Sequence, residues 1–214
     1  PDAAQLQRGR DWRALLARPV LLAAVSREGE EAMLLEAWRA VPGTDKPLLL
    51  IVPRHPQRFD EVASLIESAG LTLARRSSWQ DMPEGDAPSA DAWLGDSMRE
   101  MALYYGLADV ALLGGSFAPL GGQNLIEAAA CSCPVVMGPH TFNFAEAAAL
   151  AEAAGAALRV TDMREGLAQA LALCRDGPRR TAMATRAQQF AGQHRGAAAR
   201  MATALLTCTK PGRN

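Results

Sequence analysis

Apolar residues are grouped in seven short segments, and segments with helical periodicity lie between them. The apolar segments are of strand length and comprise residues 20–25, 48–52, 72–74, 92–94, 109–113, 134–137 and 156–160. The helical segments comprise residues 30–38, 59–69, 97–107, 123–130, 144–154 and 163–206, the last with a break at Gly177-Pro178. Strands that are apolar throughout are buried on both faces, as in a parallel sheet covered by helices. The pattern therefore predicts one α/β domain with a doubly wound, Rossmann-like parallel sheet.

The turns that follow the strands are the expected ligand site, because open parallel sheets bind ligands at the carboxyl ends of their strands. The turn after the first strand contains Ser26, Arg27 and Glu28, and Gly29 follows them. A hydroxyl, a cation and a glycine at the start of a helix suit an anion. They equally suit a charged turn in which Ser26 caps the helix. Both interpretations stay open at this stage.

The second strand ends in Pro53-Arg54-His55-Pro56. The two prolines restrict the backbone around Arg54 and His55. A guanidinium offers paired donors that match a phosphate or a carboxylate. We therefore expect this turn to bind an anionic group.

Glycine pairs follow the fifth strand. The loop after that strand contains Gly114, Gly115, Ser116, Gly121, Gly122 and Asn124. Glycines let the backbone approach a ligand, with free amides to hold oxyanions, and Glu127 is placed to accept hydrogen bonds from ribose hydroxyls. The next turn, residues 138–144, adds His140 and Asn143. Together these groups predict a sugar-nucleotide site, although no G-x-G-x-x-G or P-loop spacing is present.

Composition and charge narrow the classes of partner. The 214 residues are 49% hydrophobic and 21% charged, which is typical of a globular chain. The net charge of −1 gives no reason to expect nucleic acid, although residues 161–214 hold nine basic and three acidic side chains. The four cysteines lack metal-ligand spacing, so we expect buried or idle thiols and no metal site. Because the chain does not begin with Met, we expect it to be a piece of a longer protein.

Four stretches of the sequence resemble one known family. Residues 49–59, 95–101, 114–127 and 136–144 are similar to the C-terminal half of the 3-deoxy-D-manno-octulosonic acid (Kdo) transferase family, and the match runs in order from about residue 19 to residue 154. The most specific string is Met-Gly-Pro-His-Thr-Phe-Asn-Phe, at residues 137–144.

The resemblance implies a fold, a reaction and a separate role for each of the two domains. The fold is GT-B, with two Rossmann-like domains that face a cleft. The C-terminal domain binds CMP-Kdo and the N-terminal domain binds the lipid A precursor and supplies a glutamate as the general base. Transfer is inverting and needs neither a metal nor another cofactor. For this chain it implies an interdomain helix region at residues 1–18, a CMP-Kdo domain at 19–214, and C-terminal helices at 178–214.

The resemblance also assigns roles to residues. Arg54 corresponds to a ligand of the donor phosphate or carboxylate, and Glu127 corresponds to the ribose carboxylate. The nucleotide contacts would be Met98, Glu100 and Met101, and the phosphate loop would contain Gly121, Gly122 and Asn124. Four positions depart from the family pattern. Val25 replaces a hydroxyl residue, Arg99 replaces a glycine, Gln123 replaces a histidine and Ala128 replaces a proline.

Two alternatives remain open. The chain can be half of another GT-B enzyme or an epimerase that uses a UDP-sugar, or a nucleotide-binding module without catalytic activity. In the preferred interpretation the isolated domain is soluble and inactive. The full-length enzyme is then expected at the cytoplasmic face of the inner membrane.

Overall fold

The seven predicted strands form one parallel sheet. The computed structural model describes residues 1–43 and 46–208, with side chains as far as residue 193. Within these residues the sheet order is β3-β4-β2-β1-β5-β6-β7, and all neighbouring pairs are parallel. The strands are β1 (Val20–Ser26), β2 (Leu48–Pro53), β3 (Leu73–Arg75), β4 (Ala92–Leu94), β5 (Val110–Leu113), β6 (Val135–Met137) and β7 (Ala157–Arg159). The predicted doubly wound parallel sheet is confirmed.

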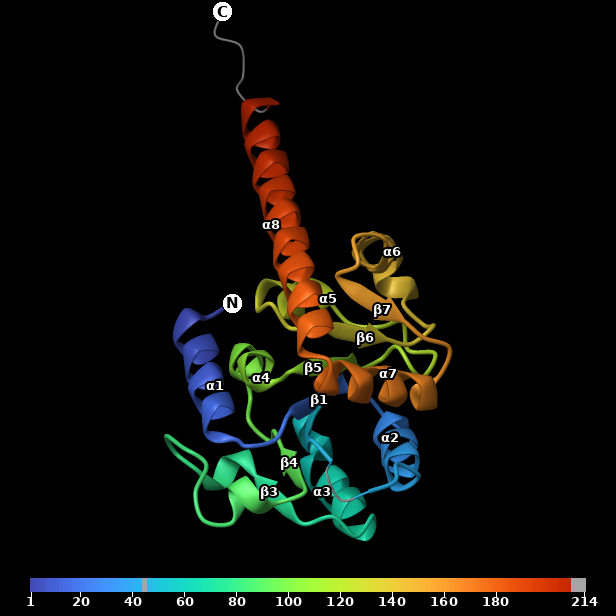
Figure 1. Ribbon diagram of the computed structural model, residues 1–214. Helices are drawn as coiled ribbons and strands as arrows, with labels where there is room; N and C mark the ends of the chain where they lie inside the picture. Colours follow the sequence, from blue (N-terminus) through green and yellow to red (C-terminus); the bar gives the residue numbers. More distant parts are fainter. Residues whose placement is uncertain (44–45, 209–214) are drawn as a thin grey trace, which may run out of the picture.

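Helices cover both faces of the sheet (Figure 1). One face packs against α1 (Ala3–Leu15), α4 (Met101–Leu107), α5 (Leu125–Ala130), α6 (Ala145–Ala153) and the first part of α8 (Gly177–Cys208). The other face packs against α2 (Glu30–Arg39), α3 (Phe59–Ser68) and α7 (Met163–Arg175). Short 3-10 turns occur at Pro56–Arg58, Arg76–Ser78, Ala87–Ser89 and Phe142–Phe144. Because the chain passes outward from β1 and returns at β5, the topological switch point lies between these two strands.

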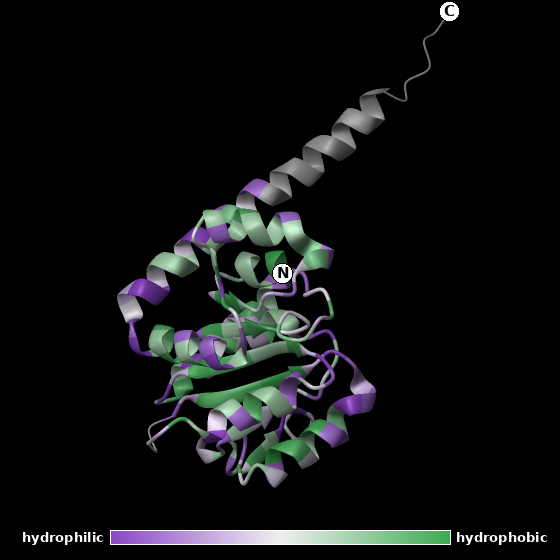
Figure 2. Cartoon of the chain, turned by 90° about the vertical axis from the view of Figure 1, so that its right-hand side faces the viewer, coloured by the Kyte–Doolittle hydropathy of each residue, from purple (hydrophilic) through white to green (hydrophobic). Residues whose placement is uncertain are grey.

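The core consists of two apolar layers, one on each face of the sheet. Figure 2 shows hydrophobic strands between helices whose outer faces are hydrophilic. Trp93 and Tyr104 are fully buried in one layer, and Ile66 is fully buried in the other. The continuous apolar runs in the sequence are therefore explained by burial on both faces.

Two helices begin later than the sequence pattern predicts. The helix expected from residue 97 begins at Met101, because Arg99 adopts a left-handed conformation with φ 64° that interrupts a helix. The helix expected from residue 123 begins at Leu125, since the Asn124 carboxamide accepts a hydrogen bond from the Ile126 amide as its N-cap. Ser26 is not the cap of α2. That position belongs to Gly29, at φ 86°.

Helices α1 and α4 pack so closely that their backbones are in contact. A Cβ atom at Gly9 would overlap the carbonyl oxygen of Leu103, and one at Gly106 would lie 2.5 Å from the carbonyl oxygen of Leu6. Glycine on both helices is what allows them to approach this closely. The position of α4 is thus set by α1. The interdomain role expected for residues 1–18 stays a prediction.

We predict that Gly106→Ala destabilises the protein, although alanine is normally the better helix former. The steric overlap should cost about 1–3 kcal/mol, more than the roughly 1 kcal/mol of helix propensity gained. Urea denaturation of Gly192→Ala is the matched control, because a Cβ atom there would meet nothing within 4 Å. Equal or greater stability of Gly106→Ala would show that the helices are not in contact.

Three of the four cysteines have buried free thiols, as expected. Burial raises the pKa of Cys131 to about 11 and that of Cys174 to about 12, and it also raises the pKa of Cys133. The side chain of Cys208 lies outside the described residues. No helix in the described part of the chain combines the length and hydropathy needed to cross a membrane.

These thiols should be unreactive until the protein unfolds. In a Cys208→Ser variant at pH 8, a pKa near 11 leaves about one thiolate in a thousand. Labelling with a thiol reagent should therefore be slow in buffer and reach three thiols in urea. Rapid labelling of the folded protein would contradict the burial of these cysteines.

Candidate functional site at the carboxyl edge of the sheet

The predicted site turns meet at one edge of the sheet. Arg54, which follows β2, donates from its backbone N–H to the carbonyl of Ser26 at the end of β1 (3.0 Å). Its guanidinium donates to the side-chain oxygen of Gln123, in the loop after β5 (2.8 Å). Gln123 departs from the family pattern, and in this structure its side chain holds the guanidinium of Arg54. The exposed guanidinium of Arg54 is held beside the glycine loop.

A second set of hydrogen bonds joins the turns after β5 and β6. His140 donates its backbone N–H to the carbonyl of Ser116 (3.0 Å), and Asn143 donates its backbone N–H to the carbonyl of Gly121 (3.0 Å). The Asn143 carboxamide also donates to the carbonyl of Leu120 (3.3 Å). Asn143 is exposed and His140 is partly exposed. The two turns thus form one surface.

The carboxylate of Glu30 lies beneath the first glycine pair. Glu30 is 2% exposed. Its carboxylate accepts backbone N–H bonds from Arg27 (2.9 Å), Gly115 (2.7 Å) and Phe117 (3.0 Å). An ionised group at this depth requires such partners. The carboxylate therefore fixes the loop after β5 to the first turn of α2.

This contact corrects the prediction that the amides of the first glycine pair are free to bind an oxyanion. The N–H of Gly115 is directed at Glu30. A Cβ atom at Gly114 would overlap the carbonyl of Val25, so this glycine is needed for the close approach of β1 and β5. Ser116 is fully buried, and its hydroxyl donates to the carbonyl of Leu113 and accepts the N–H of Gly138 (2.8 Å). These residues shape the site from within.

A buried ion pair supports the same turn. The carboxylate of Glu31 has no exposed side-chain surface, and it accepts bonds from the hydroxyl of Ser26 (2.7 Å) and the guanidinium of Arg58 (2.8 Å). Arg58 also pairs with Glu61 at 2.9 Å. Its hydrogen bonds to Glu61 and then Glu31 raise the pKa of Arg58. The hydroxyl of Ser26, which we expected to contact a ligand, is directed into the protein.

Arg27 and Glu28 remain at the surface of this turn. The side chain of Glu28 is 58% exposed and lies 3.4 Å from the guanidinium of Arg27. A hydrogen bond from its own backbone N–H, followed by bonding to Arg27, lowers the pKa of Glu28. Its carboxylate therefore stays ionised at neutral pH. His55, in the turn after β2, is partly exposed.

The second glycine pair has a different environment. Gly121 (φ 90°) and Gly122 (φ 80°) are in the left-handed region, which favours glycine. The N–H of Gly122 donates to the carbonyl of Gly115 (2.7 Å). Asn124 and Glu127 are both exposed at the start of α5. The groups nearest solvent are therefore those after the second pair.

The turn before α4 presents Met98 at the same edge. Met98 is 56% exposed. Glu100 is held by Arg76 (2.9 Å) and by the hydroxyl of Ser97. Arg99 is in the left-handed region that favours glycine (φ 64°), so this backbone conformation is adopted at some strain.

Sequence reasoning missed Glu30, Glu31 and Arg58. For the two glutamates a signal was present, because Leu34 and Trp38 follow them at helical spacing. That spacing places both carboxylates on the buried stripe of α2. From the sequence alone, the turn before these glutamates is equally consistent with an anion site and with a charged capping turn.

A cavity of the domain lies away from the candidate site. A groove of about 780 Å³ borders the outer edge of β3 and is lined by residues such as Glu67, Leu73 and Trp79. The predicted site residues do not line it. Hydrogen bonding between the turns, rather than cavity size, therefore locates the candidate site.

Comparisons with known proteins agree with this architecture. No protein-family model matches the chain. A structure described as the C-terminal CMP-Kdo binding domain of WaaA from Acinetobacter baumannii superposes with a TM-score of 0.76 at 28% identity, covering 87% of this chain and 97% of that domain. A structure of Anabaena HepE in complex with UDP and glucose shares the fold, with a TM-score of 0.60 and 17% identity over 90% of this chain and 48% of that one.

The fold is that of the C-terminal domain of a GT-B glycosyltransferase. Within that class, the chain is homologous to 3-deoxy-D-manno-octulosonic acid transferases. It is 50% identical to the Bordetella pertussis protein of that name over 94% of this chain and 47% of the relative. It is 35% identical to the Haemophilus influenzae protein over 91% of this chain and 44% of the relative. The resemblance predicted from sequence is confirmed, and the chain spans about half the length of the curated relatives it matches.

We predict that Glu30→Gln destabilises the domain by about 2–4 kcal/mol, because an amide supplies one oxygen where a carboxylate accepts several N–H bonds. Urea denaturation measures the change. The matched control is Glu36→Gln on the exposed side of α2, where the side chain is 79% exposed and should tolerate the change. Similar stability of the two variants would rule out the contact between Glu30 and the glycine loop.

Proposed function

We propose that this chain is the donor-binding domain of an inverting glycosyltransferase that transfers Kdo from CMP-Kdo to the lipid A precursor of lipopolysaccharide. The observation that carries the proposal is the structural likeness to a domain described as binding CMP-Kdo, over 97% of that domain. The sequence relationship to Kdo transferases supports the same assignment.

The donor carries two anionic groups, the phosphate diester and the sugar carboxylate. Arg54 is suited to one of them, because Gln123 orients its guanidinium through a single donor and leaves the others available. The loop at Gly121, Gly122 and Asn124 is suited to the phosphate. With the guanidinium of Arg54 supplying positive potential, binding in this proposal requires no metal ion or other cofactor.

The nucleoside lies between two elements in this proposal. Glu127 is exposed in the first turn of α5 and accepts hydrogen bonds from the ribose hydroxyls. The base lies against the turn that contains Met98, Glu100 and Met101, where the exposed Met98 thioether offers an apolar contact. Arg27, Glu28, His55, His140 and Asn143 surround the sugar. A carboxylate, an arginine and an apolar contact thus each meet a different part of the donor.

The acceptor and the general base belong to the other half of the enzyme in this proposal. The chain as given therefore binds the donor and does not transfer sugar on its own. The whole enzyme acts at the cytoplasmic face of the inner membrane, where a lipid acceptor is available. Sugar transfer from CMP-Kdo to lipid A precursor by this chain alone would contradict that division.

The test is calorimetric titration with CMP, UMP and UDP. We expect CMP to bind more tightly than either uridine nucleotide. Glu127→Ala and Arg54→Ala should each weaken CMP binding about 10- to 100-fold, since each removes hydrogen bonds that involve a charged group. Glu36→Ala, on the exposed side of α2, is the control and should bind as the wild type does.

Two results would contradict the proposal. Equal or tighter binding of UMP or UDP would favour an enzyme that uses a UDP-sugar. Full affinity for CMP in both Glu127→Ala and Arg54→Ala would place the nucleotide elsewhere on the domain.

A further inference from the structure

A buried arginine connects helix α1 to the turn before α4. Arg76 is 8% exposed and lies in the 3-10 turn after β3. Its guanidinium carbon is 5.2 Å from the ring centre of Trp12 in α1. One terminal nitrogen donates to the carbonyl of Trp79 (2.6 Å), and the other donates to the carboxylate of Glu100 (2.9 Å). One side chain thus contacts three separate segments of the chain.

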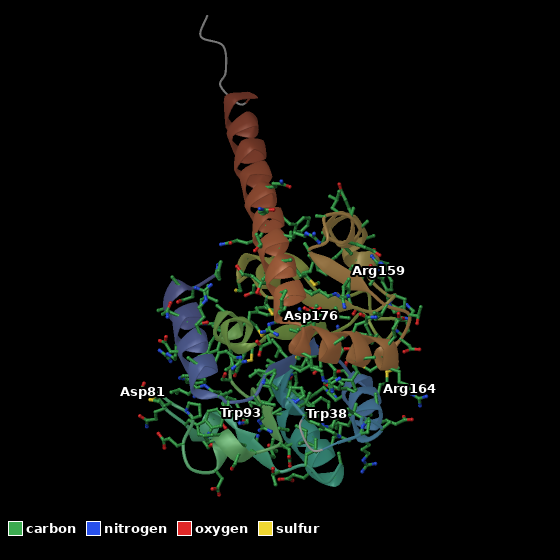
Figure 3. All side chains as sticks on the ribbon, viewed as in Figure 1. Trp38, Asp81, Trp93, Arg159, Arg164 and Asp176 are labelled. Atoms are coloured by element: carbon green, nitrogen blue, oxygen red, sulfur yellow. The ribbon has the colours of Figure 1, made fainter. Side chains whose placement is uncertain are left out.

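The surroundings of Arg76 are largely aromatic. The rings of Trp12 and Trp79 meet edge to face at 6.1 Å, and those of Trp79 and Trp93 meet at 4.7 Å. The indole N–H of Trp12 donates to the carbonyl of Asp81 (3.1 Å), and Figure 3 labels Asp81 and Trp93 on the side of the molecule below α1. The guanidinium is therefore held in one orientation.

This arrangement is costly if its only role is packing. The Nε atom of Arg76 is buried and has no hydrogen-bond partner among the described residues. Burying a cation carries a desolvation penalty, and apolar side chains of similar volume often serve a core equally well or better. The geometry instead favours a role for the two bonds that Arg76 does make, to Trp79 and to Glu100.

Helix α1 holds the same turn at a second point. The side-chain amide of Gln5 donates to the carbonyl of Arg99 (2.9 Å). The backbone contact of Gly9 with α4 fixes the helix that the turn leads into. Glu100 also accepts a bond from the hydroxyl of Ser97, so both of its carboxylate oxygens are engaged within the protein. The turn is therefore held from below while Met98 faces solvent.

We propose that Arg76 and Gln5 are positioning residues for recognition of the nucleotide base. They act through Glu100 and the backbone of Arg99, which set the conformation of residues 97–100. This inference rests on the proposed function, because the base is the group that this turn contacts. Cytosine and uracil differ in the donor and acceptor at one ring edge, so discrimination between them depends on how accurately the turn is placed.

The experiment compares two pairs of variants. Arg76→Met is paired with Arg180→Met, an arginine in α8 that also caps carbonyls, those of Leu173 and Cys174, far from the turn in sequence. Gln5→Ala is paired with Gln7→Ala, whose amide donates only to Asp11 within α1 among the described contacts. The Gln5 pair is needed because it tests the proposal at the surface if Arg76→Met fails to fold.

Two measurements are made on each variant. Hydrogen–deuterium exchange without ligand should be at least tenfold faster at residues 97–105 in Arg76→Met and about threefold faster in Gln5→Ala. The ratio of CMP to UMP affinity, measured by calorimetry, should fall about tenfold in Arg76→Met and about threefold in Gln5→Ala. Arg180→Met and Gln7→Ala should match the wild type in both measurements.

The outcomes separate this inference from the proposed function. A wild-type protein that binds CMP no better than UMP overturns both. A wild type that prefers CMP, with the same preference in Arg76→Met and Gln5→Ala, overturns the positioning role alone. Equal weakening of CMP and UMP binding also overturns it, because a merely structural role lowers both affinities together.

Discussion

The buried carboxylate of Glu30 is the interaction on which the carboxyl edge depends. An ionised carboxylate removed from water must receive hydrogen bonds, and here the donors are backbone N–H groups of the loop after β5. The loop is consequently fixed to the first turn of α2. Because β1 and β5 flank the topological switch point, the bonds of Glu30 to the loop after β5 determine the backbone conformation at the centre of the site.

The constraint also decides which groups remain available for a ligand. The first glycine pair is committed to Glu30 and to the close approach of β5 and β1. The second pair lies farther along the loop, beside Arg54 and its partner Gln123. At the other end of the edge, α1 and Arg76 hold the turn at Glu100. The face between these two anchors is where the phosphate and the nucleoside are proposed to lie.

Most of the fold was predictable from the sequence because both faces of the sheet are buried. Continuous apolar runs mark such strands, and glycines at 121 and 122 mark a loop that requires left-handed backbone. Charged residues on a buried stripe were not recognised, since Glu30 and Glu31 look like an ordinary acidic first turn. Tertiary contacts that join Arg58 to Glu31, or Arg76 to Trp12, leave no periodic signal. The start of α4 was predicted too early because an arginine at position 99 gives no sign in the sequence that its backbone is left-handed.

The central claim is that the nucleotide binds at the carboxyl edge of the sheet. The most direct measurement is backbone amide chemical-shift mapping during titration with CMP. The account predicts the largest shift changes at residues 97–101 and 121–127, with little change along the groove beside β3. Changes concentrated around Leu73 and Trp79, with the glycine loop unaffected, would contradict it.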